Sequence, residues 1–245
     1  MTIHVHPDPD AASRAGAERF RDLACAAVES SGRFAVALSG GTAPERMYRM
    51  LGEGPFLSAI PWEGVHVFWG DDRCVPPGHP RSNFTMADRA FLRTVPIPPA
   101  NVHRMRGELP PEEGAAHYTA ELESVFGPGV PRFDLVHLGI GPDGHTASLF
   151  PFDELLRERE RTVGTALFRE LGEWRLSFTL PVINAARVID VLALGAAKAE
   201  IVRTAIEGPL DPHRIPMQFI HPTDGQMIWT LDEAAAARLK SIRQG

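Results

Sequence analysis

Short apolar runs alternate with longer amphipathic segments along most of the chain. The clearest runs have the length of strands and occupy residues 34–38, 65–69, 133–138 and 188–194. Their almost unbroken apolar character is typical of strands buried on both faces of a parallel sheet. Weaker strand signals occur at residues 3–5, 175–180 and 227–230.

The segments between these runs have helical spacing. One helix is predicted to start after Asp8 or Asp10, which can cap it, and to end at Gly32. Further helices are predicted through residues 45–51, 84–91, 112–126, 198–206 and 233–239. Alternating strands and helices favour an α/β fold with a doubly wound, mainly parallel sheet and helices on both faces. We expect a single domain over residues 1–245.

Polar residues follow three of the apolar runs, and the first group is a glycine turn. Ser39, Gly40, Gly41 and Thr42 come directly after residues 34–38 and before a helix. A strand, a glycine turn and a helix together direct backbone N–H groups and the positive end of a helix dipole at one point, where phosphate can bind. Alternatively, Thr42 at the N-cap and a glutamate three residues later form a capping box, which needs no ligand.

Two cationic residues occupy comparable positions. Arg73 ends the group Gly70-Asp71-Asp72-Arg73, which follows residues 65–69 and precedes a loop rich in Pro and Gly. It is a candidate ligand contact, although charges at strand ends are often only solvated. Lys198 lies in the first turn of a predicted helix, where a positive charge opposes the helix dipole unless an anion is near. It is either an anion contact or a surface lysine.

The third polar group contains the candidate base. Gly139, Gly141 and Gly144 match the dinucleotide-binding pattern G-x-G-x-x-G. We reject that interpretation because Asp143 would place a negative charge where a pyrophosphate should bind, and no acidic ribose ligand follows at the required distance. An imidazole can accept a proton from water near neutral pH, so His145 is a candidate general base that Asp143 could orient. The alternative is an ordinary polar surface turn.

Composition narrows the possible partners. The 245 residues carry a net charge of −6, with 44% hydrophobic and 23% charged residues, which are ordinary values for a globular protein. An acidic chain argues against a nucleic-acid partner but still permits a small anionic ligand. No apolar run approaches the ~18 residues of a membrane helix, and the N-terminus lacks a signal-peptide pattern. The two cysteines have no metal-type spacing. We therefore expect a cytoplasmic protein without a metal site or a membrane partner.

An anion-binding loop, a cation and a general base at one sheet edge predict a hydrolase or isomerase that acts on a phosphorylated small molecule. The same stretches resemble the 6-phosphogluconolactonase family, within the glucosamine-6-phosphate isomerase/6-phosphogluconolactonase superfamily. The resemblance is carried by ALSGGTAPERMY at residues 37–48, FWGDDRCVPPGHPRSN at 68–83, GIGPDGHTASLFP at 139–151, TLPVINAARVIDVLALGAAKA at 179–199 and WTLDEAAA at 229–236.

The resemblance implies a Rossmann-like fold and hydrolysis of 6-phospho-D-glucono-1,5-lactone, a sugar-phosphate lactone, to 6-phosphogluconate in the oxidative pentose phosphate pathway. It implies no metal or organic cofactor. By position, His145 is the implied general base, with Asp143 beside it. Ser39, Gly40, Gly41 and Thr42 correspond to the phosphate-side loop, Arg73 to the motif arginine and Lys198 to a late lysine. The division of phosphate and carbonyl contacts between Arg73 and Lys198 stays open.

Two other functions remain possible. The first is an isomerase or deaminase of amino-sugar phosphates, but the resemblance places a glutamate of the deaminases at the position of Phe150 here. The second is a noncatalytic sugar-phosphate sensor, which would need a DNA-binding module. We expect no such module in the short segment before the first helix. The chain also has Asp72 where the lactonases commonly have glutamate, which leaves any contact of Asp72 open.

Overall fold

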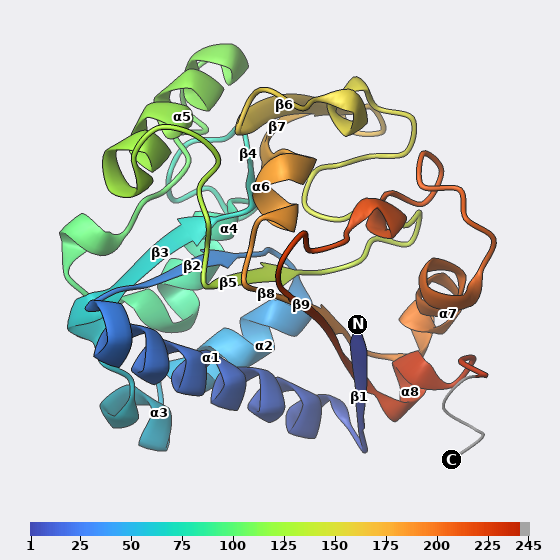
Figure 1. The fold of residues 1–245 in the computed structure, drawn as a ribbon, viewed down its shortest axis with the longest axis horizontal. Coiled ribbons are helices and arrows are strands. Elements are labelled where there is room, and N and C mark those ends of the chain that lie inside the picture. The colour runs from blue at the N-terminus through green and yellow to red at the C-terminus, as the bar shows by residue number, and fades with distance from the viewer. Residues whose placement is uncertain (241–245) are drawn as a thin grey trace.

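The central element is a six-stranded sheet in which every strand pair is parallel. It is seen in a computed structural model that describes residues 1–240, so the last five residues of the predicted domain lie outside the described part. The strand order is β1-β9-β8-β5-β2-β3 (Figure 1). The strands are β1 Thr2–His6, β2 Phe34–Leu38, β3 Val65–Trp69, β5 Leu135–Leu138, β8 Val188–Ala193 and β9 Gln226–Asp232. The predicted α/β fold with a mainly parallel sheet is confirmed.

Helices cover both faces of this sheet. Figure 1 shows α1 and α2 on one side and α5 and α6 on the other. The α-helices are α1 Pro9–Ser31, α2 Thr42–Leu51, α3 Gly54–Ala59, α4 Asn83–Ala87, α5 Pro111–Phe126, α6 Leu180–Asn184, α7 Ala199–Glu207 and α8 Glu233–Ala236. A π-helical turn at Asp88–Leu92 continues α4, and 3₁₀ turns lie at Trp62–Gly64, Pro99–Asn101, Glu154–Arg157, Ala196–Lys198 and Pro216–Phe219.

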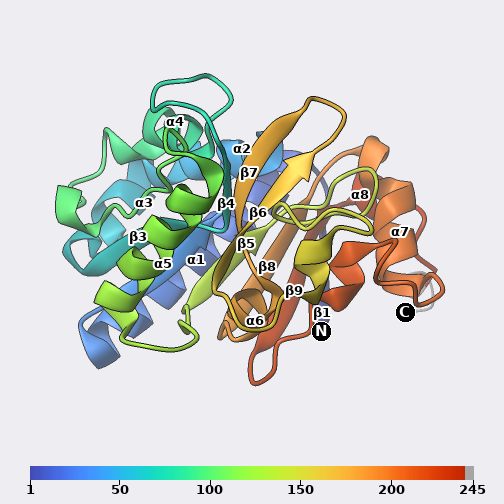
Figure 2. The same cartoon turned by 90° about the horizontal axis from the view of Figure 1, so that it is seen from above.

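A second, three-stranded antiparallel sheet was not predicted from the sequence. It has the order β4-β7-β6, with β4 Asp71–Arg73, β7 Glu173–Phe178 and β6 Val163–Phe168. Figure 1 shows it on the side of the larger sheet that carries α5 and α6, and Figure 2 shows the same arrangement from above. The strand predicted at residues 175–180 is therefore β7 of the small sheet. The polar group at residues 71–73 is itself a strand rather than only the end of β3.

Local chemistry sets both ends of α1, whereas two other helix ends differ from the prediction. Asp8 caps α1 by accepting from the N–H of Ala11 at 2.8 Å, and Gly32 ends the helix in the left-handed conformation at φ 73°. The capping box at Thr42 is wrong, because Gly41 is the N-cap of α2 and Thr42 is already helical, with no side-chain cap. The last helix, α8, stops at Ala236 rather than Leu239.

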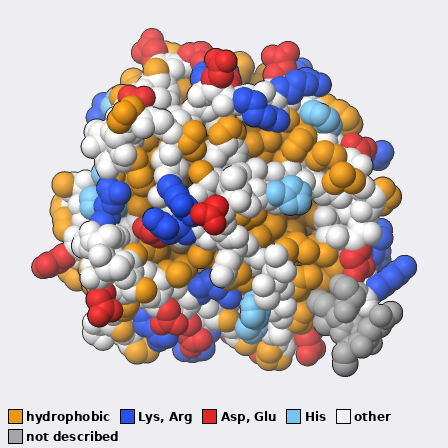
Figure 3. Space-filling view, in the orientation of Figure 1, with side chains coloured by type: hydrophobic (Ala, Val, Ile, Leu, Met, Phe, Trp, Pro, Cys, Tyr) orange, Lys and Arg blue, Asp and Glu red, His pale blue; other side chains and the backbone are white. Residues whose placement is uncertain are grey.

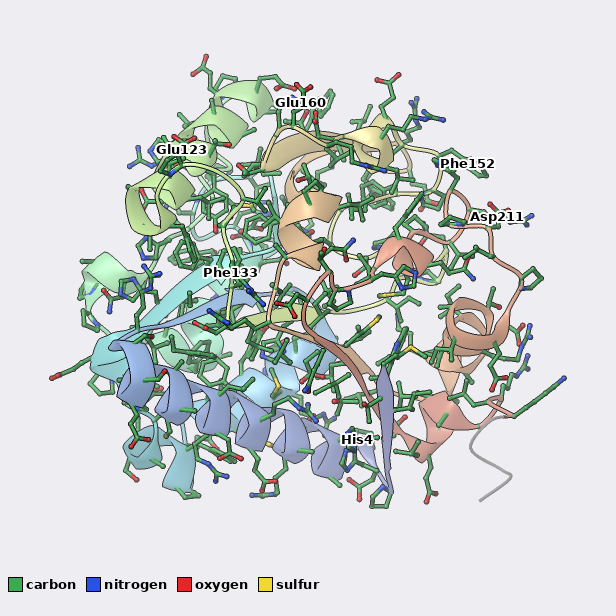
Figure 4. All side chains as sticks on the ribbon, viewed as in Figure 1. His4, Glu123, Phe133, Phe152, Glu160 and Asp211 are labelled. Carbon is green, nitrogen blue, oxygen red and sulfur yellow. The ribbon has the colours of Figure 1, made fainter. Side chains whose placement is uncertain are left out.

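Aromatic side chains pack the sheet on both faces. On the α1 side, the ring of Phe20 lies 5.3 Å from the ring of Phe34 in β2. On the α5 side, Phe133, labelled in Figure 4, lies 5.2 Å from both Phe68 of β3 and Phe178 of β7. The small sheet therefore packs onto the same hydrophobic core as the large one.

The chain order of the strands identifies where a ligand should bind. From β2 the chain proceeds to β3 at one edge, and it then returns to β5 on the opposite side of β2. The connections after β2 and β5 therefore diverge, which opens a crevice at the carboxyl ends of these two strands. Open α/β sheets bind ligands at such switch points. The two polar groups at residues 39–42 and 139–148 both begin there.

His137 in β5 is a buried ionisable residue away from this crevice. Its side chain is 1% exposed, its ring stacks 6.3 Å from that of Phe20, and Asp190 Oδ2 lies 3.9 Å from its Nδ1. Burial lowers the pKa of His137 to about 4, although the charge of Asp190 opposes this shift and that of Arg19 adds to it. His137 is therefore neutral in the folded protein at neutral pH.

This shift predicts a pH-dependent loss of stability. Between a pH of about 6.5 and about 4, the unfolded chain binds a proton at His137 and the folded chain does not, so the free energy of unfolding falls as pH falls. The loss amounts to at most about 3 kcal/mol at 1.36 kcal/mol per pKa unit. Urea unfolding at several pH values should show a steeper decline in the parent protein than in His137→Leu. Equal slopes in the two proteins would contradict the prediction.

The molecular surface mixes both signs of charge. On the face shown in Figure 3, Lys and Arg side chains are interspersed with Asp and Glu among exposed apolar groups. Within residues 1–240, none of the helices combines the length and the apolar character needed to cross a membrane.

Candidate active site

A cavity of about 480 Å³ lies at the carboxyl ends of the central strands. Its walls come from the β2–α2 turn, the small sheet, the segment after β5, the end of β8 and the last residue of the 3₁₀ turn before α7. Seven of the eight residues proposed from the sequence line it: Ser39, Gly40, Gly41, Thr42, Arg73, His145 and Lys198. The eighth, Asp143, is not among the lining residues.

His145 and Asp143 form a bonded pair at the end of β5. His145 Nδ1–H donates to Asp143 Oδ1 at 2.5 Å, and the backbone N–H of His145 donates to the same oxygen at 3.1 Å. A carboxylate at Nδ1 assigns the ring proton to that nitrogen, which leaves the lone pair on Nε2. The imidazole is 27% exposed, so it faces solvent and the cavity rather than the interior.

The charge state of Asp143 suits this role. Burial raises the pKa of its carboxyl, but the hydrogen bonds and charge of His145 outweigh burial, so the pKa lies below its ordinary value. Asp143 is therefore ionised at neutral pH and can stabilise a positive charge on the ring.

Two glycines make the turn before His145 possible. Gly144 has φ +86°, which most side chains avoid. Gly141 lies directly against the imidazole, because a Cβ placed there would be 2.1 Å from both Cε1 and Nδ1 of His145. The residues after β5 stay in turns, with no helix until the 3₁₀ turn at Glu154–Arg157, so the helix of a dinucleotide-binding motif is absent between them.

Apolar contacts fix the outer side of the same segment. The ring of Phe150 lies 5.1 Å from that of His145, and Phe168 of β6 lies 5.2 Å from Phe150. Phe152, two residues after Phe150, has φ +60° and donates its N–H to the carbonyl oxygen of His213 at 2.8 Å. Figure 4 shows Phe152 beside Asp211, so the later loop over residues 211–217 supports this segment.

The β2–α2 turn has unsatisfied polar groups that face the cavity. The N-terminal N–H groups of α2, at Thr42 and Ala43, have no acceptor within their own helix. The Oγ of Ser39 is buried and has no hydrogen-bond partner among the described residues. The backbone of Ser39 is held in place by Tyr48, whose hydroxyl accepts from the Ser39 N–H at 3.0 Å. These groups can bind the oxygens of an anion.

The acidic pair that precedes Arg73 has a structural role. Asp71 Oδ2 accepts from Ser148 Oγ at 2.7 Å, which ties β4 to the segment that carries His145. Asp72 accepts from the N–H groups of Asn83 and Phe84 at 2.7 and 3.0 Å. These bonds close the loop between β4 and α4. Burial raises the pKa of the Asp72 carboxyl to about 6, although three backbone N–H donors oppose the shift.

The two predicted cations reach the cavity from different elements, Arg73 from β4 and Lys198 from the 3₁₀ turn before α7. Arg73 donates from Nη1 to Asn83 Oδ1. Lys198 donates from Nζ to the carbonyl oxygen of Ile140 at 2.7 Å, and its pKa is lowered by burial, which the nearby charge of Asp143 opposes. Lys198 is therefore part of the cavity wall next to the His145 turn and not an isolated surface lysine.

The small sheet and the loop after β4 supply lining residues that the sequence did not reveal. Arg81 comes from the loop, and the others from β6, β7 and the turn between them: Phe168, Leu171, Glu173 and Arg175. Glu173 lies between two of them, 2.8 Å from Arg81 Nη1 and 2.5 Å from Arg175 Nη2. No local motif marks these residues, because their position depends on how β7 pairs with β4. Among residues 1–240, no cluster of three or more His, Cys, Asp or Glu side chains is arranged to hold a metal ion.

Comparisons with known proteins identify the family of the chain. The family model of glucosamine-6-phosphate isomerases/6-phosphogluconolactonase matches residues 7–229. A 6-phosphogluconolactonase of Synechocystis sp. is 42% identical over 220 residues, which cover 87% of this chain and 88% of that protein. A 6-phosphogluconolactonase of Nostoc sp. is 38% identical over 244 residues, covering 97% and 98% of the two chains.

A solved structure extends the likeness to the fold. The 6-phosphogluconolactonase of Trypanosoma brucei superposes with a TM-score of 0.87 at 28% identity, and the match covers 97% of this chain and 98% of that one. The family model and the relatives cover well over half of the sequence, as the motifs at residues 37–48 and 139–151 predicted. The chain therefore belongs to the glucosamine-6-phosphate isomerase/6-phosphogluconolactonase family.

Proposed function

We propose that this protein hydrolyses 6-phospho-D-glucono-1,5-lactone to 6-phosphogluconate, with His145 as the general base. The observation that supports this most is that a free imidazole nitrogen and an anion-binding turn line the same cavity. The curated relatives named above are 6-phosphogluconolactonases, which supports the same substrate and reaction.

The reaction needs few parts because a lactone is an activated ester. Nε2 of His145 takes a proton from water, and the resulting hydroxide adds to the carbonyl carbon C1 of the lactone. The ring C–O bond then breaks, and the imidazolium returns its proton to the ring oxygen that leaves. Asp143 holds the imidazole in the required tautomer and stabilises its positive charge while the proton is held there.

The remaining proposed residues bind and orient the substrate. The N–H groups of the β2–α2 turn and the hydroxyl of Ser39 bind the phosphate, which fixes the sugar relative to the water. Arg73 and Lys198 add positive charge on two sides of the cavity, where negative charge is carried by the phosphate and develops on the carbonyl oxygen. Holding the substrate by its phosphate allows a single base to act on a correctly placed carbon.

The environment of His145 argues against deamination. Phe150 places an apolar ring 5.1 Å from the imidazole, at the position where the deaminases carry a glutamate. An aldose–ketose rearrangement moves protons at two carbons, and Phe150 cannot accept or donate one. We therefore expect no ammonia release from glucosamine 6-phosphate.

A coupled assay tests the proposed function. Freshly prepared lactone is mixed with the protein and excess 6-phosphogluconate dehydrogenase, and NADP reduction is compared with a blank that lacks the protein. We expect reduction well above the spontaneous rate in the blank. A rate equal to the blank, with 6-phosphogluconate still bound, would favour the noncatalytic sensor. Ammonia release from glucosamine 6-phosphate in a parallel sample would favour the deaminase.

A further inference from the structure

Two arginines lie side by side on neighbouring strands of the small sheet, at the wall of the cavity. In the antiparallel register of β4 and β7, Arg73 is paired directly with Arg175, and both line the cavity. Like charges on directly opposed residues destabilise a strand pair. The pKa of the Arg175 guanidinium is lowered mainly by burial, and the charge of Arg73 lowers it further. The positive charge concentrated here would be relieved by a bound anion.

The surrounding carboxylates only partly neutralise these arginines. Glu173 is shared, since its two oxygens lie 2.5 Å from Arg175 Nη2 and 2.8 Å from Arg81 Nη1. Asp71 uses its carboxylate to accept from Ser148 and Asn83. The side chain of Arg175 is 9% exposed, and its Nε has no hydrogen-bond partner among residues 1–240. A buried guanidinium with an unused donor is costly unless a ligand satisfies it.

The arginine pair also adjoins the β2–α2 turn. Arg73 donates to Asn83 Oδ1, and Asn83 in turn donates from Nδ2 to the carbonyl oxygen of Asp71 at 2.8 Å. The amide of Asn83 lies against Gly40, because a Cβ added at Gly40 would be 2.0 Å from Asn83 Oδ1. The pair is therefore placed next to the turn to which we assign the phosphate.

We propose that Arg73 and Arg175 form a clamp for an anionic group of the substrate, and that Arg175 is a substrate-binding residue positioned by Glu173. This rests on the proposed function for the identity of the substrate. The ligand chemistry is an oxyanion, and a phosphorylated lactone supplies it in two places: the phosphate, and C1, where an oxyanion forms during hydrolysis and a carboxylate remains in the product. Two guanidinium groups suit either, because each can donate two parallel hydrogen bonds to one such group.

The rival account is that Arg175 only anchors β7 through its ion pair with Glu173. Calorimetric titration with 6-phosphogluconate separates the two, because it measures binding without turnover. The clamp predicts that Arg175→Met weakens binding about 10- to 100-fold, the effect of losing a charge-assisted hydrogen bond. Arg132→Met is the matched control, since Arg132 is an exposed arginine that bonds Asp224 away from the cavity. Arg132→Met should bind 6-phosphogluconate as tightly as the parent protein.

A folded Arg175→Met protein that binds 6-phosphogluconate as tightly as the parent would overturn the clamp. If this variant fails to fold because Glu173 loses its closest partner, Glu173→Gln/Arg175→Met removes both charges and takes its place. Removing both members of a buried ion pair is often tolerated where removing one is not. The same loss of affinity is expected in the double variant, and parent-like affinity there would again overturn the proposal.

Two further ligands distinguish which anion the clamp holds. Sorbitol 6-phosphate carries only the phosphate, and gluconate carries only the carboxylate. A loss confined to sorbitol 6-phosphate assigns the clamp to the phosphate, and a loss confined to gluconate assigns it to C1. A parent protein that binds none of the three ligands would overturn the clamp. A parent that binds 6-phosphogluconate through Arg175 but does not hydrolyse the lactone would contradict the proposed function and leave the clamp standing.

Discussion

Replacing His145 with alanine should lower kcat for 6-phospho-D-glucono-1,5-lactone by ~10²–10⁴-fold, the usual contribution of a general base. The reason is that Nε2 of His145 is the group proposed to remove the proton from water, while Asp143 supports it from the other ring nitrogen. Binding of 6-phosphogluconate should persist, because the β2–α2 turn is unchanged. Stopped assays corrected for spontaneous hydrolysis measure the first effect, and calorimetry measures the second.

His4→Ala is the matched control for this variant. His4 is an exposed histidine on β1, at the edge of the large sheet, and is labelled in Figure 4. Its replacement should leave kcat within about twofold of the parent, as expected for a surface substitution with little effect on the fold. Near-parent kcat in His145→Ala would remove His145 from the mechanism.

Adding one methyl group at Gly141 should be almost as damaging as removing the imidazole. A Cβ at this position would lie 2.1 Å from Cε1 and Nδ1 of His145 and 2.8 Å from Asp143 Oδ1. The ring is a side chain that can rotate away, so we expect the fold to survive and the His145–Asp143 geometry to be lost. A displacement of about 1 Å can cost ~10²-fold in rate, so kcat should fall by about that factor in Gly141→Ala.

Gly70→Ala tests whether that loss is specific to position 141. A Cβ at Gly70 would make an ordinary contact of 3.6 Å with the carbonyl oxygen of Leu38. This variant should keep kcat close to that of the parent, and thermal unfolding should be cooperative in both variants. If Gly141→Ala retained the parent kcat, the close packing of Gly141 against the base would not matter for the reaction.

The large sheet could be predicted because its strands carry their own signal. The runs at residues 34–38 and 65–69 match β2 and β3 to the residue, since strands buried on both faces are apolar throughout and end at glycine or polar residues. The glycine turn after β2 and the turn after β5 were placed correctly for the same reason. Their meeting at one cavity follows from the parallel arrangement of the strands.

The small sheet could not be predicted because its pairing is set by distant segments. β4 has only three residues, and Asp71 is paired with Ser177, more than a hundred positions later. Nothing local in a group such as Asp71-Asp72-Arg73 distinguishes a short strand from a polar loop. As a result, the sequence indicated Arg73 but not Arg175, which reaches the cavity only through this pairing.

The structure bears on the predicted domain number and the predicted capping box, but not on the location or the residue roles. The buried side chains form a continuous cluster that includes residues of both sheets, from which we infer one domain over the described residues. The cytoplasmic location and the roles of the individual site residues stay predictions. The capping box at Thr42 failed because Gly41 is the N-cap and Thr42 is already the first residue of the helix.

A crystal structure with 6-phosphogluconate bound would test the central claim most directly. We predict that the phosphate binds the N–H groups of the β2–α2 turn and that the C1 carboxylate lies within reach of Nε2 of His145, either directly or through one water molecule. A product bound with C1 remote from His145, or with its phosphate away from that turn, would contradict the account.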